Sequence, residues 1–336
     1  MAQAILLVGG FGTRLMPLTS TVPKPMLPIA GLPVTEHQLA MAKRAGITSL
    51  VLATSYLSEV FIPYFGDGSK WGMKLQYAVE EEPLGTGGAI RNAAQLLTNS
   101  ESIVIFNGDV LSSHDLAKQI HMHEELNADV TMHLTHVDDA RAFGCVPIDD
   151  EGHVTAFLEK MENPVTNTIN AGCYVFNPRV INDIPAGKVV SVEREIFPNM
   201  VVNGQAIYGM VDDSYWIDIG TPKALLQCSA DVVRGKASQG ALVGVPLVHQ
   251  SLDYIAHDGA VIEPGAIITG GSAVGRTARV GVGALVDASI VCDGATVMRG
   301  AKIHNSFVAA HATVSSEMNL RDSYISDGEI VSLLPL

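Results

Sequence analysis

The chain contains 336 residues, of which 47% are hydrophobic, and it carries a formal net charge of −14. The length exceeds the roughly 250–300 residues at which single hydrophobic cores stop growing, so we expect two domains. The acidic balance and the lack of a Lys/Arg cluster argue against a partner that is a nucleic acid or an anionic membrane. The sequence shows no stretch of about 18 apolar residues, no visible secretory signal and no Cys-x-x-Cys pair among its four cysteines. These features predict a cytoplasmic protein with reduced thiols.

The first predicted element is a buried parallel strand at residues 4–8, an apolar run that leads into a glycine loop. Three of the four residues at 9–12 are glycines, whose missing Cβ atoms leave backbone N–H groups accessible to an anion. Arg14 adds a planar guanidinium and Lys24 a compact ammonium group. This segment predicts a binding site for a polyphosphate.

Two common phosphate-binding glycine motifs do not fit this loop. A Walker A loop requires Gly-x-x-x-x-Gly-Lys-Ser/Thr, and a dinucleotide fingerprint requires a third glycine where this chain has Leu15. On the glycines alone, a tight strand-to-helix turn without a ligand stays open.

Strand-like and helix-like segments alternate up to about residue 234. The alternation predicts an α/β fold with a Rossmann-like, mostly parallel sheet flanked by helices, and ligands beyond the carboxyl ends of its strands. We expect a first domain over 1–234 and, from the small and polar residues that follow, a linker over 235–254. The predicted strands are 47–53, 103–106 and 129–136, and the predicted helices are 36–45 and 113–127.

Two acidic residues follow apolar segments where a metal–phosphate complex could bind. Asp109 comes after the strand at 103–106, although an N-cap or turn residue explains it equally well in isolation. Asp218 lies in the run Trp-Ile-Asp-Ile at 216–219, where a carboxylate is costly unless it is paired or bound to a metal. Mg²⁺ takes one or two carboxylates plus phosphate oxygens, so the pair predicts a magnesium site.

Four histidines fall in pairs that cannot share a face. His121 and His123 lie two apart on a predicted helix, and His133 and His136 lie three apart on a predicted strand. This spacing favours structural roles over metal binding.

Beyond about residue 255, aliphatic residues recur every six positions with small residues between them. A six-residue period predicts a β-helix in which one aliphatic side chain per strand stacks inward, and an irregular glycine-rich tail does not explain five aliphatics in phase. We expect roughly four coils over 255–336. The repeated aliphatics are Ile262, Ile268, Val274, Val280 and Val286 and, after a one-residue slip, Val291, Val297 and Ile303.

Several motifs together resemble the sugar-1-phosphate nucleotidylyltransferases, or NDP-sugar pyrophosphorylases. The resemblance spans essentially the whole chain and is nearest to the bacterial mannose-1-phosphate guanylyltransferases, or GDP-mannose pyrophosphorylases. It implies a GT-A-like nucleotidyltransferase domain followed by a left-handed β-helix. The motifs are Gly-Gly-x-Gly-Thr-Arg-Leu-x-Pro-Leu-Thr at 9–19, Pro-Lys-Pro at 23–25, Pro-Leu-Gly-Thr-Gly-Gly at 83–88, Asn-Gly-Asp at 107–109, Asn-Ala-Gly-Cys-Tyr-Val-Phe at 170–176 and Trp-Ile-Asp-Ile-Gly-Thr-Pro at 216–222.

The resemblance also implies roles for individual residues. Without it, Glu159 and Lys160 read as a surface ion pair, and Met161 departs from the family by replacing the usual proline. The implied catalytic residues are Arg14, Lys24, Asp109 and Lys160, and the implied magnesium ligands are Asp109 and Asp218. The implied nucleotide ligands are Val8, Gly9, Gly10, Gly12, Thr13, Arg14, Lys24, Glu82, Pro83, Gly85, Thr86, Asn107, Gly108 and Asp109, and the implied sugar-phosphate ligands are Gly144, Glu159, Lys160, Asn170 and Lys188.

The reaction implied by the resemblance is GTP + α-D-mannose 1-phosphate ⇌ GDP-mannose + pyrophosphate. A phosphate monoester has a second pKa near about 6, so the attacking oxygen needs no general base and the protein supplies positioning and charge neutralisation. Three alternatives stay open. They are the same chemistry with UTP or with glucose or heptose 1-phosphate, a non-catalytic regulatory subunit that senses nucleotide sugars, and an acyltransferase activity in the β-helix.

The predicted β-helix implies a surface through which subunits assemble. Its end coil and flat faces expose stacked aliphatic residues unless another subunit or the first domain covers them. We therefore expect a homo-oligomer in which the β-helix serves assembly and not chemistry.

Overall fold

The computed structural model describes residues 2–10, 12–20, 22–54, 58–98, 100–326 and 328–333. Its contacts divide the chain into two compact units, Met1–Gly10 with Gln38–Trp216 and Phe11–His37 with Ile217–Leu336. We call them the sheet unit and the β-helix unit. The division into folding domains at 1–234, 235–254 and 255–336 stays a prediction.

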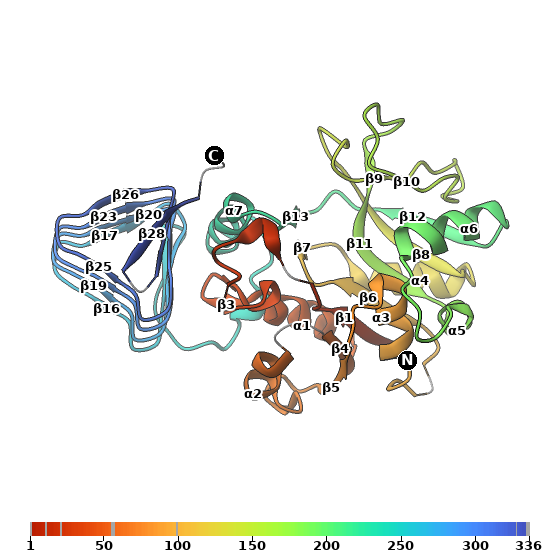
Figure 1. Ribbon diagram of the computed structural model, residues 1–336, viewed down its shortest axis with the longest axis horizontal. Coiled ribbons are helices and arrows are strands. Elements are labelled where there is room, and N and C mark those ends of the chain that lie inside the picture. Colours follow the sequence, from red (N-terminus) through yellow and green to blue (C-terminus); the bar gives the residue numbers. More distant parts are fainter. Residues whose placement is uncertain are drawn as a thin grey trace. The chain divides into compact units, whose positions relative to one another are not determined.

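The sheet unit is built on a nine-stranded sheet within the described residues, in the order β10-β9-β11-β6-β1-β4-β5, with β8 pairing β11 and β12. β6, β1, β4 and β5 are parallel neighbours, which confirms the predicted α/β class (Figure 1). The sequence did not indicate the antiparallel part, in which β11 pairs with β6, β8 and β9. Within the described residues, the nine strands of this sheet are β1 (Gln3–Leu7), β4 (Ser49–Thr54), β5 (Lys74–Val79), β6 (Ile103–Asn107), β8 (Val130–His136), β9 (Gly144–Cys145), β10 (Leu158–Glu159), β11 (Thr168–Phe176) and β12 (Ile207–Val211), and β7 (Val110–Ser112) lies outside this sheet.

The parallel strands form the core of this unit. Ile5 pairs in register with Val51 on one side and Ile105 on the other, and all three are fully buried. Strands that are covered on both faces are apolar throughout rather than alternating, which is why short apolar runs predicted them. The helices of this unit are α2 (Phe61–Phe65), α3 (Gly85–Ala94), α4 (Leu116–Glu125), α5 (Pro178–Asp183) and α6 (Phe197–Val202), with short helices at Ser58–Val60, Ser69–Trp71 and Val192–Ile196.

The helix boundaries differ from the prediction by two or three residues. α1 (Val34–Arg44) begins before the predicted residue 36. α4 begins at Leu116 and not at 113, because the carboxylate of Asp115 accepts the Lys118 N–H at 3.0 Å as an N-cap. No helix among the described residues is both long and apolar enough to cross a bilayer.

The β-helix unit contains the hairpin β2–β3, helix α7 and three sheets that the chain visits in turn. β15, β18, β21, β24 and β27 form one sheet, and two four-stranded sheets complete the coils, as in a parallel β-helix (Figure 1). β14 and β28 add antiparallel strands to the first sheet. The elements, including β13, whose first residue belongs to the sheet unit, are β2 (Pro28–Ile29), β3 (Leu32–Pro33), β13 (Trp216–Asp218), α7 (Pro222–Val233), β14 (Leu247–Gln250), β15 (Tyr254–His257), β16 (Val261–Ile262), β17 (Ile267–Thr269), β18 (Ser272–Val274), β19 (Arg279–Val280), β20 (Leu285–Asp287), β21 (Ile290–Val291), β22 (Thr296–Val297), β23 (Lys302–His304), β24 (Phe307–Val308), β25 (Thr313–Val314), β26 (Asn319–Arg321), β27 (Ser323–Ser326), β28 (Glu329–Ser332) and short helices at Thr13–Leu15, Lys24–Met26 and Gly240–Leu242.

The predicted aliphatic repeat forms the core of the coils. Seven of the eight predicted aliphatics are buried together, and Ile262 packs partly buried at their edge. The one-residue slip in the repeat corresponds to a shorter coil. The coil from Ile262 to its partner Val280 has 18 residues, and the coil from Val280 to its partner Val297 has 17.

A column of buried serines runs along the first sheet of the β-helix. The N–H groups of Ser289, Ser306 and Ser323 each donate to the hydroxyl of the serine one coil earlier, at 3.1, 3.0 and 3.1 Å, beginning with Ser272. Each hydroxyl in turn donates to a backbone carbonyl. The column satisfies polar groups that burial would otherwise leave without partners, and its 17-residue spacing was visible in the sequence.

Candidate active site

Two cations converge on one carboxylate in the β-helix unit. The Arg14 Nη2 and the Lys24 Nζ each lie 3.9 Å from an oxygen of Asp218. The side chain of Lys24 is 11% exposed and that of Arg14 is 68% exposed, so the lysine is held inside the site and the arginine is open to solvent. The three residues carry a net charge of +1, which suits an anionic ligand.

The residues after Asp218 explain why this motif contains a glycine. A Cβ on Gly220 would lie 2.7 Å from the Arg14 Nη2 and 2.9 Å from the Asp218 Oδ1, so a side chain here would require the arginine or the carboxylate to move. The hydroxyl of Thr221 then accepts the Ala224 N–H at 3.2 Å and caps α7, with Pro222 in its first turn. The motif therefore holds the carboxylate and starts the helix.

The glycine loop divides between the two units. Val8 directly follows β1, and its N–H donates to the Ala53 carbonyl, while Gly9 and Gly10 are exposed. Gly12 has a φ of 57°, and its carbonyl accepts the Thr19 hydroxyl at 2.9 Å. Phe11, which the loop motif includes, lies outside the described residues.

Asp109 follows β6 in the sheet unit, as predicted. Gly108 brings the backbone against β1, since its N–H donates to the Leu7 carbonyl at 2.9 Å and a Cβ would lie 2.2 Å from that oxygen. The buried Gln38 amide donates to the carbonyls of Asn107 at 2.8 Å and Val110 at 3.0 Å, on either side of Asp109. Gln38 was missed by the sequence analysis, because nothing in the local pattern of a helix identifies it as a support for this turn.

The start of α3 packs against the segment that contains Lys188. The Gly87 N–H donates to the Val190 carbonyl, and the Thr86 hydroxyl donates to Glu193 at 2.7 Å and accepts the Val192 N–H at 2.9 Å. The Lys188 carbonyl lies 2.5 Å from where a Cβ on Gly88 would be. The structure thus brings a predicted nucleotide-binding loop and a predicted sugar-phosphate ligand to neighbouring positions, while Glu82 and Pro83 are exposed.

Three predicted sugar ligands lie on adjacent strands. Gly144 on β9 pairs with Glu159 on β10, and the Glu159 Oε2 lies 3.1 Å from where a Cβ on Gly144 would be. Lys160 follows with an exposed side chain and a φ of 40°, an uncommon conformation for a residue other than glycine. Asn170 lies on β11, which also pairs with β9.

Asn170 sits at an irregularity of β11. Its Oδ1 accepts the Gly172 N–H at 3.0 Å and its Nδ2 donates to the Tyr174 hydroxyl at 2.7 Å, which fixes the orientation of the amide. The Trp216 indole donates to the Ala171 carbonyl at 2.9 Å. Burial raises the pKa of Tyr174 far above its usual value, so this hydroxyl stays protonated.

A family model described as "Nucleotidyl transferase" matches residues 3–235. The chain belongs to the nucleotidyl transferase family. It is 53% identical over 263 residues to the mannose-1-phosphate guanylyltransferase of Mycobacterium tuberculosis, covering 78% of this chain and 72% of that protein. It is 36% identical over 274 residues to a probable mannose-1-phosphate guanylyltransferase of Oryza sativa, covering 78% and 75%. Among solved structures, HddC from Yersinia pseudotuberculosis superposes with a TM-score of 0.59 at 30% identity, over 68% of this chain and 98% of that chain.

Nucleotidyl transferases of this family generally use a divalent metal. In the part of the chain that the structure describes, no group of three or more His, Cys, Asp and Glu side chains is arranged to hold a metal ion. Mg²⁺ in proteins is usually bound by one or two carboxylates, with phosphate or water oxygens completing its shell. Asp218, 27% exposed and still accessible to a ligand, fits that donor set.

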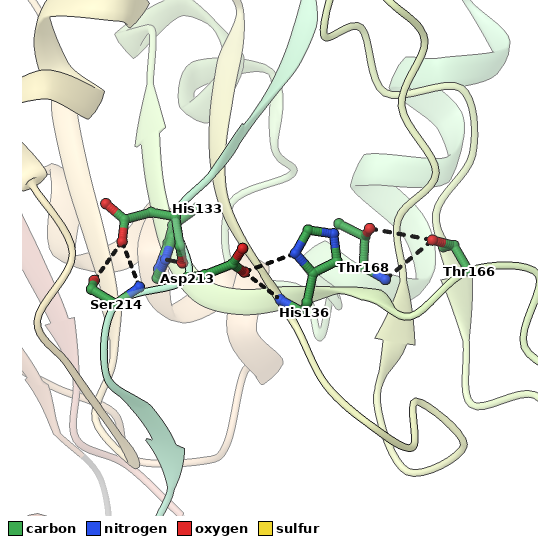
Figure 2. Close-up of polar contacts among 7 residues, drawn as sticks. His133, His136, Thr166, Thr168, Asp213 and Ser214 are labelled. Carbon is green, nitrogen blue, oxygen red and sulfur yellow. Dashed lines mark hydrogen bonds and ion pairs between the residues drawn. The ribbon is translucent and has the colours of Figure 1, made fainter.

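Polar contacts brace the 212–214 segment of this nucleotidyl transferase. Figure 2 shows His136 and Asp213 pointing toward one another, with 2.8 Å between Nδ1 and Oδ1. His133 Nε2 lies 3.4 Å from the Asp212 carbonyl, and its ring stacks on His114 at 3.8 Å between centroids. These contacts give His133 and His136 partners within the protein.

Proposed function

We propose that this nucleotidyl transferase makes GDP-mannose from GTP and α-D-mannose 1-phosphate, releasing pyrophosphate. The observation that carries the chemistry is the convergence of Arg14 and Lys24 on Asp218. The choice of substrates is supported by the names of the M. tuberculosis and O. sativa relatives.

The proposed mechanism is an in-line attack of the sugar phosphate on the α-phosphate. Arg14 and Lys24 hold the departing pyrophosphate, and Lys160 offsets the charge of the sugar phosphate as it approaches. Asp109 and Asp218 would hold Mg²⁺, which would supply further neutralisation of phosphate charge. The remaining predicted ligands around Glu159 and Asn170 orient the sugar.

A pyrophosphate-release assay tests the reaction directly. ATP, CTP, GTP and UTP are each offered with mannose 1-phosphate and with glucose 1-phosphate. We expect the highest kcat/KM for GTP with mannose 1-phosphate. A preference for UTP, or for glucose 1-phosphate, would move the proposal to a different substrate pair of the same chemistry, and no release with any pair would favour a regulatory subunit.

Substitutions of Arg14 and Lys160 test whether these residues act on different groups, the leaving pyrophosphate and the sugar phosphate. We expect Arg14→Ala to lower kcat by about 10²-fold, because its partner is the leaving group, and Lys160→Ala to raise the KM for the sugar phosphate about 10-fold with kcat within a few-fold of native. Initial rates at varied GTP and sugar phosphate give both constants.

Matched controls are Arg141→Ala and Lys118→Ala, which remove cations that are exposed and lie outside the proposed site. Both should stay near native rates. The same kinetic pattern in Arg14→Ala and Lys160→Ala would contradict the proposed division of labour.

We also propose a cytoplasmic location and a homo-oligomeric state, on the sequence features that predicted them. Light scattering of the full chain tests the second. A monomer at micromolar concentration would rule out the predicted assembly role of the β-helix.

A further inference from the structure

A strained turn follows the segment that carries Lys24. The hairpin β2–β3 reverses direction through Ala30 and Gly31, whose φ values are 49° and 82°. Positive φ at both central residues defines a type I′ turn, which favours Asn-Gly, whereas an alanine in the first position is disfavoured. Such a conformation persists only where surrounding contacts hold it.

Three buried side chains hold this turn. The Ala30 N–H donates to the Ser229 hydroxyl of α7 at 3.0 Å, and the Ala30 carbonyl lies 2.7 Å from the His257 Nε2 of β15. One residue earlier, the Ile29 carbonyl lies 3.0 Å from the His37 Nε2 of α1. His257, in the first coil of the β-helix, therefore holds the carbonyl group of the strained residue Ala30.

The hydrogen bond determines the form of the His257 ring. A carbonyl only accepts, so Nε2 carries a proton and donates. Burial lowers the pKa of His257, with the Ala30 carbonyl acting in the opposite direction, which favours the neutral ring at neutral pH. A Cβ on Gly31 would lie 2.1 Å from Nε2, so the imidazole packs directly against the turn.

The turn is joined to Lys24 by a continuous set of hydrogen bonds. The Thr35 hydroxyl donates to the Pro25 carbonyl at 3.0 Å, and the Val34 N–H donates to the Leu27 carbonyl at 3.1 Å. With the short helix at Lys24–Met26, these contacts make 24–35 a tightly packed segment. These contacts connect the backbone on either side of the turn with the Lys24 carbonyl, which accepts the Leu27 N–H at 3.1 Å.

We propose that His257 is a positioning residue for Lys24: through the Ala30 carbonyl, the first coil of the β-helix sets where the lysine ammonium group meets the pyrophosphate. The inference rests on the proposed function, in which Lys24 is the pyrophosphate ligand. It gives the β-helix a part in catalysis beyond assembly.

The test uses the reverse reaction of the full chain, with GDP-mannose and pyrophosphate. We expect His257→Leu to raise the KM for pyrophosphate about 10-fold and to leave the KM for GDP-mannose within about 2-fold, because only the lysine is displaced. His257→Gln, whose amide can still donate to the Ala30 carbonyl, should restore most of the loss. Val297→Ala removes a fully buried side chain from a later coil and serves as the stability control, with both KM values unchanged.

A double-mutant cycle with Lys24→Met decides whether His257 acts through the lysine. We expect His257→Leu to change the KM for pyrophosphate less than about 2-fold once Lys24 is replaced. If His257→Leu does not fold, Ser229→Ala removes the other contact to Ala30 and enters the same cycle.

Three results would overturn the inference while leaving the proposed function intact. They are additive effects in the cycle, a failure of His257→Gln to restore the KM for pyrophosphate, and an equal rise of that KM in Val297→Ala. A native KM for pyrophosphate in Lys24→Met would instead overturn the role of Lys24 and this inference with it.

Discussion

Asp109→Asn and Asp218→Asn should each lower kcat by about 10²–10³-fold without unfolding the protein, which is the size of effect expected when one charge that stabilises the transition state is removed. Asparagine keeps the shape and most hydrogen bonds of the carboxylate but loses its charge. Initial rates at saturating GTP, sugar phosphate and Mg²⁺ measure the effect, and thermal unfolding checks the fold.

Asp218→Asn offers a second readout that does not depend on turnover. Arg14 and Lys24 lose their shared counter-charge, so the site becomes more positive. In EDTA, we expect Asp218→Asn to bind GTP at least as tightly as the native protein, by calorimetry. Asp183→Asn, at an exposed position at the end of α5, is the matched control and should stay near native in both assays. Turnover within a few-fold of native in Asp218→Asn would reject its role in catalysis.

Acidification from pH 6.5 to 4.5 should destabilise the protein steeply, by about 4 kcal/mol per pH unit near pH 5. Burial lowers the pKa of His114 to about 3 and the pKa values of His123 and His133 to about 4, from the ordinary 6.5. Near pH 5 the unfolded chain binds close to one proton at each of the three histidines, and the folded chain binds almost none. Stability therefore falls as pH falls, by about 1.4 kcal/mol per pH unit for each histidine.

Urea unfolding at pH 7.5, 6.0, 5.5 and 5.0 measures this slope. His37 and His257, whose pKa values burial also lowers, act in the same direction. A comparison of two histidines on α4 isolates one contribution. We expect His123→Gln, at a buried position, to reduce the slope of stability against pH by about 1.4 kcal/mol per pH unit, the contribution of one proton. His121→Gln, at an exposed position, should leave the slope unchanged. A flat stability profile down to pH 5 would contradict the neutral state of these rings.

Local patterns identified β1, β4, β6, β8, α1, α4 and the repeat of the β-helix, because these elements depend on spacing along the chain. The apolar run at 103–106 predicted β6 and the acid that follows it, and the helix starts were missed only by the two or three residues that capping decides, as at Asp115. The antiparallel part of the sheet escaped because strand direction is set by pairing between distant segments, such as Phe176 with Val130. No local sequence pattern in either strand identifies the strand with which it pairs.

The same distinction applies to the site. By itself the sequence determined the glycine loop, Asp109 at the end of its strand, the charge-bearing motif at 216–222 and the aliphatic repeat of the β-helix, because each is a short pattern with its own physical requirement. Only the tertiary structure decided that Lys24 and Arg14 face Asp218, about 200 residues away, and that His257 and Ser229 hold Ala30. Those contacts arise from packing between elements far apart in the chain, and packing leaves no periodic signal in the residues that it brings together.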